Sequence, residues 1–89
     1  MAIFEKTIQN KKFDQLLWKL ENEIPASSWS AELEAGSDFK EGDARCSVRV
    51  FERYSVMGGN QAVFFKVNTL GEESFLEDVK GLLEEILEE

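Results

Sequence analysis

Few side chains of this 89-residue sequence have the chemistry that catalysis or metal binding requires. The chain has no histidine, the commonest general base and metal ligand of proteins. Its one cysteine, Cys46, has no second cysteine for a disulfide or a zinc site, and its place in an apolar alternation predicts a small core residue. We therefore expect a protein that is not an enzyme, with no catalytic residue, no cofactor and no metal.

Two short motifs have the residue types of a binding loop without its spacing. Asp38, Glu41 and Asp43 could suggest calcium, but they do not match an EF-hand, and no bidentate glutamate closes the loop. Residues 58–60, Gly-Gly-Asn, do not open a helix, and no Lys-Ser or Lys-Thr pair follows them as in a phosphate-binding loop. The sequence therefore predicts a solvated acidic loop and a tight hairpin turn.

The charge balance limits the partners of the chain. Acidic residues outnumber basic residues 18 to 10, which gives a net charge of -8 at pH 7. Nucleic acids and anionic membranes are bound through clustered Lys and Arg, so we expect neither as a partner. No apolar run approaches the roughly 20 residues of a membrane span, and residues 1–10 lack the apolar core of a signal peptide. We expect a cytoplasmic location.

Two segments alternate apolar and polar residues with a period of two, which is typical of strands with one buried and one wet face. In residues 28–35 the apolar residues are Trp29, Ala31, Leu33 and Ala35. In residues 44–57 one face carries Cys46, Val48, Val50, Tyr54 and Val56, and the other carries Arg45, Arg49 and Arg53. Glu52 falls on the apolar face, so it either points inward or marks a bulge that turns it to solvent. Residues 61–67 predict a third strand.

Two further segments have the spacing of amphipathic helices. In residues 11–24 an apolar stripe predicts a helix with Asn10 as its N-cap and Pro25 as its stop. Thr69 and Glu72 form a capping box ahead of a second apolar stripe, which predicts a helix capped by Thr69 that continues nearly to the end of the sequence.

Together with a short first strand in residues 1–8, these elements follow the order (β)-α-β-β-β-α. Tight connections favour an antiparallel sheet of three to four strands. Two amphipathic helices on one face of that sheet complete a two-layer α+β sandwich. Because 89 residues have room for one hydrophobic core, we expect residues 1–89 to form a single domain.

The wet face of the predicted sheet mixes arginines with aromatic residues. The arginines fit either cross-strand ion pairs or an anion site, and the aromatics are either an interface or covered by another segment. Trp18, opposite the apolar stripe of the first helix, is either an isolated exposed residue or an interface anchor. The leading hypothesis is a non-enzymatic module for self-association or protein interaction, most simply a homodimer. Its predicted interface consists of Trp18, Arg49, Phe51, Arg53 and Phe64.

The alternative hypothesis is a small-ligand binding module. Its pocket would lie between the sheet and the helices, lined by Trp29, Glu52, Tyr54 and Phe65. A carboxylate that faces inward must be paired or neutralised, which can mark a functional site. A bulge that turns Glu52 to solvent would remove that signal.

Several short patterns also resemble those of a known family. They are Phe4-Glu5-Lys6 with Phe13-Asp14, the run Val50 to Ser55 followed by Gly58-Gly59-Asn60, and the run Asn68 to Glu73. Over most of its length the chain resembles a family of small uncharacterised proteins of Firmicutes-type bacteria, a domain of unknown function. The resemblance implies a bacterial cytoplasmic protein without a known activity. It also implies a shortened member, which lacks an additional hairpin between Asn60 and Gln61.

Overall fold

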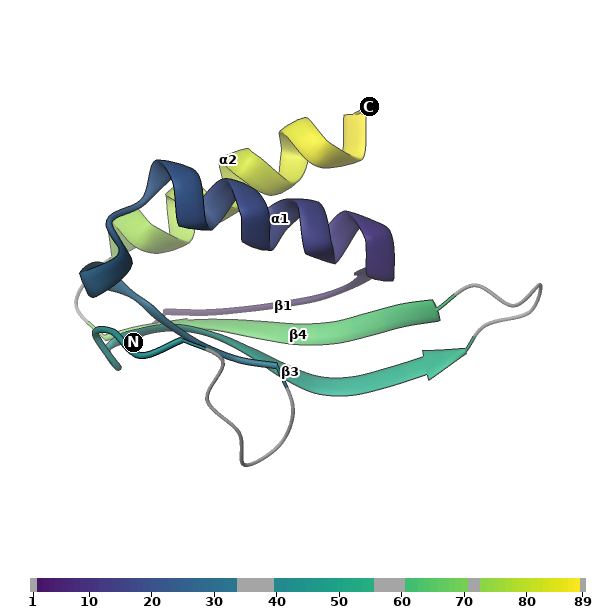
Figure 1. The fold of residues 1–89 in the computed structure, drawn as a ribbon, viewed down its shortest axis with the longest axis horizontal. Coiled ribbons are helices and arrows are strands. Elements are labelled where there is room, and N and C mark those ends of the chain that lie inside the picture. Colours follow the sequence, from purple (N-terminus) through teal and green to yellow (C-terminus); the bar gives the residue numbers. More distant parts are fainter. Residues whose placement is uncertain (1, 34–39, 56–60, 71–72, 89) are drawn as a thin grey trace.

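The chain follows the element order β-α-β-β-β-α. The computed structural model describes residues 2–33, 40–55, 61–70 and 73–88. The elements are β1 (Ala2–Gln9), α1 (Asn10–Glu23), a short 3₁₀ helix (Ala26–Ser28), β2 (Ser30–Glu32), β3 (Cys46–Ser55), β4 (Gln61–Thr69) and α2 (Glu73–Glu88). Both helices lie on one face of a four-stranded sheet (Figure 1), which confirms the predicted two-layer α+β sandwich. The predicted turn at residues 58–60 lies outside the described residues.

The sheet is mixed rather than antiparallel. Its strand order is β1-β4-β3-β2, with β4 antiparallel to both neighbours and β2 parallel to β3. The prediction of an antiparallel sheet is therefore wrong for β2, because an apolar alternation defines the buried face of a strand and not its direction. The long connection from Glu32 to Cys46 lets the chain return to the same end of the sheet, as a parallel pair requires.

Helix α1 follows β1 without a loop. Its first residue is Asn10, and Gln9 occupies the N-cap position without a side-chain hydrogen bond, so the prediction of Asn10 as the N-cap is wrong. The side-chain oxygen of Asn10 instead accepts a hydrogen bond from Arg53 of β3. The predicted stop at Pro25 is confirmed, because Ile24 has the extended backbone that proline imposes on the residue before it.

Helix α2 is held at its C-terminal end by two lysines of α1. The Lys12 ammonium group donates a hydrogen bond to the carbonyl oxygen of Ile86 at 2.9 Å, and Lys19 lies 3.5 Å from the Glu85 carboxylate. Cations stabilise this end of a helix, where the last carbonyls lack partners. At the other end, Thr69 is the last residue of β4, and Glu72 of the predicted capping box lies outside the described residues.

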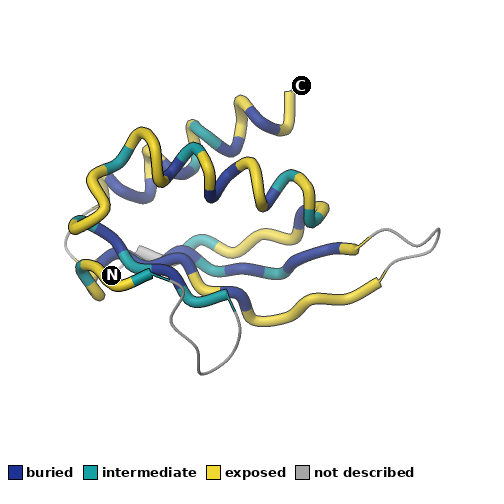
Figure 2. The backbone as a smooth tube through the Cα atoms, viewed as in Figure 1, coloured by how far each residue is buried: buried dark blue, intermediate teal, exposed yellow. Residues whose placement is uncertain are grey.

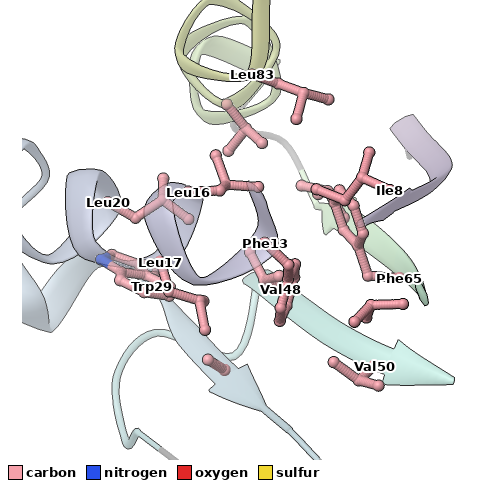
Figure 3. Close-up of a cluster of buried hydrophobic side chains, with 14 of the residues drawn as sticks. Ile8, Phe13, Leu16, Leu17, Leu20, Trp29, Val48, Val50, Phe65 and Leu83 are labelled. Carbon is pink, nitrogen blue, oxygen red and sulfur yellow. The ribbon is translucent and has the colours of Figure 1, made fainter. Parts of the chain in front are cut away.

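The hydrophobic core fills the space between the two layers, where the buried residues gather in Figure 2. Phe13 of α1 packs against Phe65 of β4 with ring centroids 5.1 Å apart, and Trp29 packs against Phe75 of α2 at 6.3 Å. Figure 3 shows Trp29 under α1 and Phe65 beside Phe13. Trp29, Phe13 and Phe65 have no exposed surface. The apolar stripe predicted for residues 11–24 therefore faces the core, as do Val63, Phe65 and Val67 of β4.

The segment from Lys40 to Asp43 packs against the residues that precede β2. The Lys40 ammonium group donates hydrogen bonds to the carbonyl oxygens of Ala26 and Trp29 and lies 4.1 Å from the centre of the Trp29 ring. Burial lowers the pKa of Lys40, an effect that Glu21 partly opposes. Gly42 lies against the same two carbonyls: a Cβ at this position would overlap the Trp29 oxygen and come within 2.9 Å of the Ala26 oxygen.

We expect Gly42→Ala to lower the free energy of unfolding by about 1–3 kcal/mol, the usual range for overpacking, because the obstructing atoms are backbone atoms. Gly81→Ala is the matched control. Gly81 is exposed in α2, and an added methyl group would meet no atom within 4 Å. Helix propensity should then raise the stability by up to about 1 kcal/mol. Urea denaturation measures both changes. A Gly42→Ala protein as stable as the wild type would contradict the close approach.

Candidate functional site on the outer face of the sheet

A β-bulge in β3 determines which side chains face away from the helices. Val50 pairs with Phe65, and Glu52 pairs with Phe64, so Phe51 is an extra residue in β3. Two consecutive residues, Phe51 and Glu52, therefore lie opposite the single residue Phe64. The Phe51 and Phe64 rings are in contact, with centroids 6.0 Å apart. The predicted bulge near Glu52 is confirmed.

The bulge reverses the in-out alternation in the second half of β3. Glu52 and Tyr54 lie opposite the outward residues of β4, whereas Arg53 lies opposite Val63 on the helix side. The Arg53 guanidinium is 5.8 Å from the centre of the Phe13 ring. The prediction that Arg53 shares a face with Arg49 is thus wrong, as is the prediction that Tyr54 faces the core.

We use the term outer face for the strand side chains that point away from both helices, on the lower side of the sheet in Figure 1. This face includes Glu5, Thr7, Glu32, Arg49, Phe51, Glu52, Tyr54, Ala62, Phe64 and Lys66. Two ion pairs cross neighbouring strands: Lys66 lies 3.0 Å from Glu5, and Arg49 lies 2.9 Å from Glu32. Exposed pairs of this kind contribute less than about 1 kcal/mol each. The Arg49 pair confirms the predicted cross-strand ion pairing for that one of the three arginines.

Aromatic side chains occupy the centre of the outer face. Phe51 is 52% exposed and Tyr54 is 37% exposed, while Phe64 is half-buried between its neighbours. The Lys66 ammonium group lies 4.7 Å from the centre of the Phe51 ring. Within the described part of the chain, neither helix covers this face. It therefore exposes adjacent aromatic surface beside paired charges.

A hollow of about 320 Å³ lies next to the aromatic pair. It is lined by Thr7, Glu52, Tyr54 and Phe64. Ala62 pairs with Tyr54 on the same face but does not line the hollow. The hollow thus lies where the register brings Thr7 of β1 and Phe64 of β4 beside Glu52 and Tyr54 of β3.

The residues of the predicted interface do not share one surface. Arg49, Phe51 and Phe64 lie together on the outer face, whereas Arg53 lies on the helix side of the sheet. Trp18 is 65% exposed on α1, in the other layer of the sandwich. A flat partner that contacts the outer face cannot reach Trp18.

The residues of the predicted ligand pocket do not meet in one cavity either. Trp29 and Phe65 are fully buried in the core, while Glu52 and Tyr54 lie on the outer face. A different cavity of about 320 Å³ opens at one end of the sandwich, with Cys46 in its wall. The polar side chains that line it are Ser28, Asp43, Ser74 and Asp78. Among the described residues, no three His, Cys, Asp or Glu side chains are grouped to hold a metal ion.

Sequence reasoning missed Thr7 and Lys66. Thr7 pairs with Phe64, and Lys66 pairs with both Glu5 and Arg49. The alternation in residues 4–8 and 61–67 does place these two side chains on the polar face. Only the register between β1 and β4 shows that they adjoin the aromatic residues.

Asp43, from the predicted acidic loop, binds an arginine. Its carboxylate accepts hydrogen bonds from the Arg45 guanidinium, the shortest at 2.7 Å, and from the Arg45 backbone N–H at 2.9 Å. These contacts, the side-chain bonds first, lower the pKa of Asp43 to about 2 from an ordinary 3.8. Arg45 precedes β3 and does not join Arg49 in the sheet.

Residues 1–62 match the model of a family of unknown function, DUF6054. The chain belongs to this family. The resemblance to an uncharacterised family is confirmed at this level. No curated protein matches the chain, and no solved structure does. In the part of the chain that the structure describes, no helix has the length and apolar character to cross a membrane.

The DUF6054 match ends at the second residue of β4. The matched part contains β1 and β3, but these strands are not neighbours, because β4 lies between them. Most of β4 and all of α2 therefore come from residues after the match. The outer face combines both parts, with Thr7 and Phe51 inside the match and Phe64 and Lys66 after it.

We expect Arg45→Ala to raise the pKa of Asp43 from about 2 towards 3.8, because the guanidinium is lost while the backbone N–H remains. A carbon-detected NMR titration of the carboxyl group measures it. A pKa lowered by folding stabilises the fold above pH 3.8, and this stabilisation is lost as the pH falls towards 2. The variant should therefore lose less stability across that window. Arg49→Ala, which breaks a pair with Glu32 instead, should leave the Asp43 titration unchanged.

Proposed function

We propose that this DUF6054 domain is a non-enzymatic interaction module that self-associates as a homodimer through its outer face. The observation that supports the proposal is the aromatic centre of that face, Phe51, Tyr54 and Phe64, which no described helix covers. Interfaces are enriched in aromatic residues and arginine at their centres. Contiguous apolar surface of this kind on a soluble domain marks interaction sites more often than scattered single residues do.

The charge of the outer face also suits a second copy of the chain. Its ionisable residues are two basic and three acidic, Arg49, Lys66, Glu5, Glu32 and Glu52. Its net charge is thus -1, whereas the whole chain carries -8. Two copies repel one another over most of their surfaces, and this repulsion is weak where the outer faces meet.

The edge of β1 is a weaker candidate for self-association. Opposite residues of an antiparallel pair point to the same face, so a two-fold axis must pass through a residue that faces its own copy. In the registers with the longest overlap that residue is Glu5 or Lys6, and a like charge would lie directly opposite. Edge charges of this kind protect strands from pairing.

The cavity at the end of the sandwich supports small-ligand binding as a second candidate function. It lies where α1 ends and α2 begins, and its wall combines the apolar Phe75 with the polar Ser28, Ser74 and Asp78. A mixed lining of this type is usual for small-molecule sites. Fragment screening by NMR tests it: shifts confined to these residues would favour this function, and their absence at millimolar fragment would count against it.

The cellular setting that we propose is the cytoplasm of a Firmicutes-type bacterium, with the chain as a shortened family member. A single buried cysteine fits a reducing compartment, because no disulfide can form within the chain. Finding the gene for this chain in a bacterial genome would test the proposed origin. The lengths of other family members would test the proposed shortening.

We expect light scattering to give a mass that rises from one copy to two as the concentration increases. Phe64→Ser should hold the protein at one copy over the same range, because it removes the ring against which Phe51 packs. The control is Trp18→Ser, which removes a more exposed aromatic residue from the helical layer and should leave the dimer intact. A wild type that stays monomeric throughout would overturn the proposal. A dimer lost only in Trp18→Ser would move the interface to α1.

A further inference from the structure

The geometry points to a reciprocal contact in which Phe51 of each copy inserts into the hollow of the other. This inference rests on the self-association proposed above and specifies how two outer faces fit. The inserting residue and the receiving hollow are adjacent on one face but distinct, because Phe51 is not among the residues that line the hollow. An interface that contains both a projection and its receptor is self-complementary, as two-fold dimers require.

Phe51 is suited to insertion because the bulge moves it out of the regular strand pairing. As the extra residue of β3 it has no cross-strand partner of its own, and it is 52% exposed. Its ring is nevertheless supported, by Phe64 at 6.0 Å and by the Lys66 ammonium group at 4.7 Å. A supported aromatic ring loses little conformational entropy on binding, which is why such residues anchor interfaces.

The hollow is suited to receive an aromatic ring. Tyr54 and Phe64 supply aromatic walls, and Thr7 closes the side towards β1. The fourth wall is the Glu52 side chain. A carboxylate beside the rim of an aromatic ring is favourable, because the ring edge carries partial positive charge.

A two-fold axis that crosses the strands at Phe64 makes both contacts at once. On one side of Phe64 lies a charged row: Glu5, Lys66, Arg49 and Glu32. On the other side lies an uncharged row: Gln9, Ala62 and Tyr54. This axis places each charged row against the uncharged row of the other copy, while Glu52, which pairs with Phe64 on the axis, faces its own copy.

The contact would place two sheets face to face. A stable interface buries about 800 Å² per partner, or roughly a seventh of the 5528 Å² exposed by one copy. Two sheets packed face to face lie about 10 Å apart with their strands nearly aligned, a spacing that interdigitating side chains fill. The bulge takes Phe51 out of the regular pairing and leaves it 52% exposed, so we expect its ring to fill that gap.

Two variants separate the two halves of the contact. Phe51→Ala removes the inserting ring and leaves the hollow open. Thr7→Trp fills the hollow and leaves Phe51 in place, and tryptophan suits an exposed strand position. We expect the dissociation constant of each homodimer to rise at least about tenfold, which is typical for the loss of an interface anchor. Sedimentation velocity measures both, and NMR spectra establish that each variant is folded.

An equimolar mixture of the two variants is the decisive experiment. The Phe51→Ala chain offers an open hollow, and the Thr7→Trp chain offers an intact Phe51, so a mixed dimer regains one of the two contacts. We expect native mass spectrometry to detect this mixed dimer by its mass at concentrations where each variant alone is monomeric. A residue whose substitution merely weakened the fold would not be rescued by mixing.

The outcomes distinguish this inference from the proposed function. If the wild type dimerises and Phe51→Ala does so equally well, or if the mixture stays monomeric, the reciprocal insertion is wrong while self-association stands. If the wild type never dimerises, both are wrong. Lys6→Trp is the matched control, because it adds the same ring to the preceding residue of β1, whose side chain lies on the opposite face of the sheet. Dimerisation lost equally in Lys6→Trp would contradict the assignment of the hollow.

Discussion

The extra residue at Phe51 is the constraint on which the surface of this domain depends. Without it, the alternation that starts at Cys46 would continue, and Glu52 and Tyr54 would face the core. The bulge turns both to the outside and brings Arg53 inward, where it binds Asn10 at the start of α1. One inserted residue thus exposes the aromatic group, removes a carboxylate from the core and ties β3 to the first helix.

Strand β4 is the second constraint, because it joins β1 to β3, two strands that do not otherwise pair within the sheet. It lies between β1 and β3 and contributes Val63, Phe65 and Val67, all fully buried, to the core. The residues that match DUF6054 end where this strand begins. The matched residues thus contain β1 and β3 but only the start of β4, the strand that lies between them. The fold is complete only with β4 and α2.

The sequence predicts what depends on local periodicity and misses what depends on register. The stripe of α1, the stop at Pro25 and the bulge near Glu52 follow from spacing and from backbone chemistry, and each is confirmed. The direction of β2 does not follow, because alternation is the same in parallel and antiparallel strands. The position of Arg53 does not follow either: a bulge can be anticipated from one misplaced charge, but its exact residue decides which later side chains turn inward.

The helical layer and the outer face of the sheet differ in charge. Helix α2 contains six acidic residues and one lysine, and its acidic C-terminal end is held by Lys12 and Lys19 of α1. The outer face is nearly neutral, since Glu5 and Glu32 are paired with Lys66 and Arg49. Repulsion between two copies is therefore concentrated on the helical layer, while the aromatic surface lies on the other. A second copy, which carries the same charge, is repelled least at the outer face, and burial of apolar surface is most favourable at that same face. Electrostatics and the hydrophobic effect therefore favour the same face.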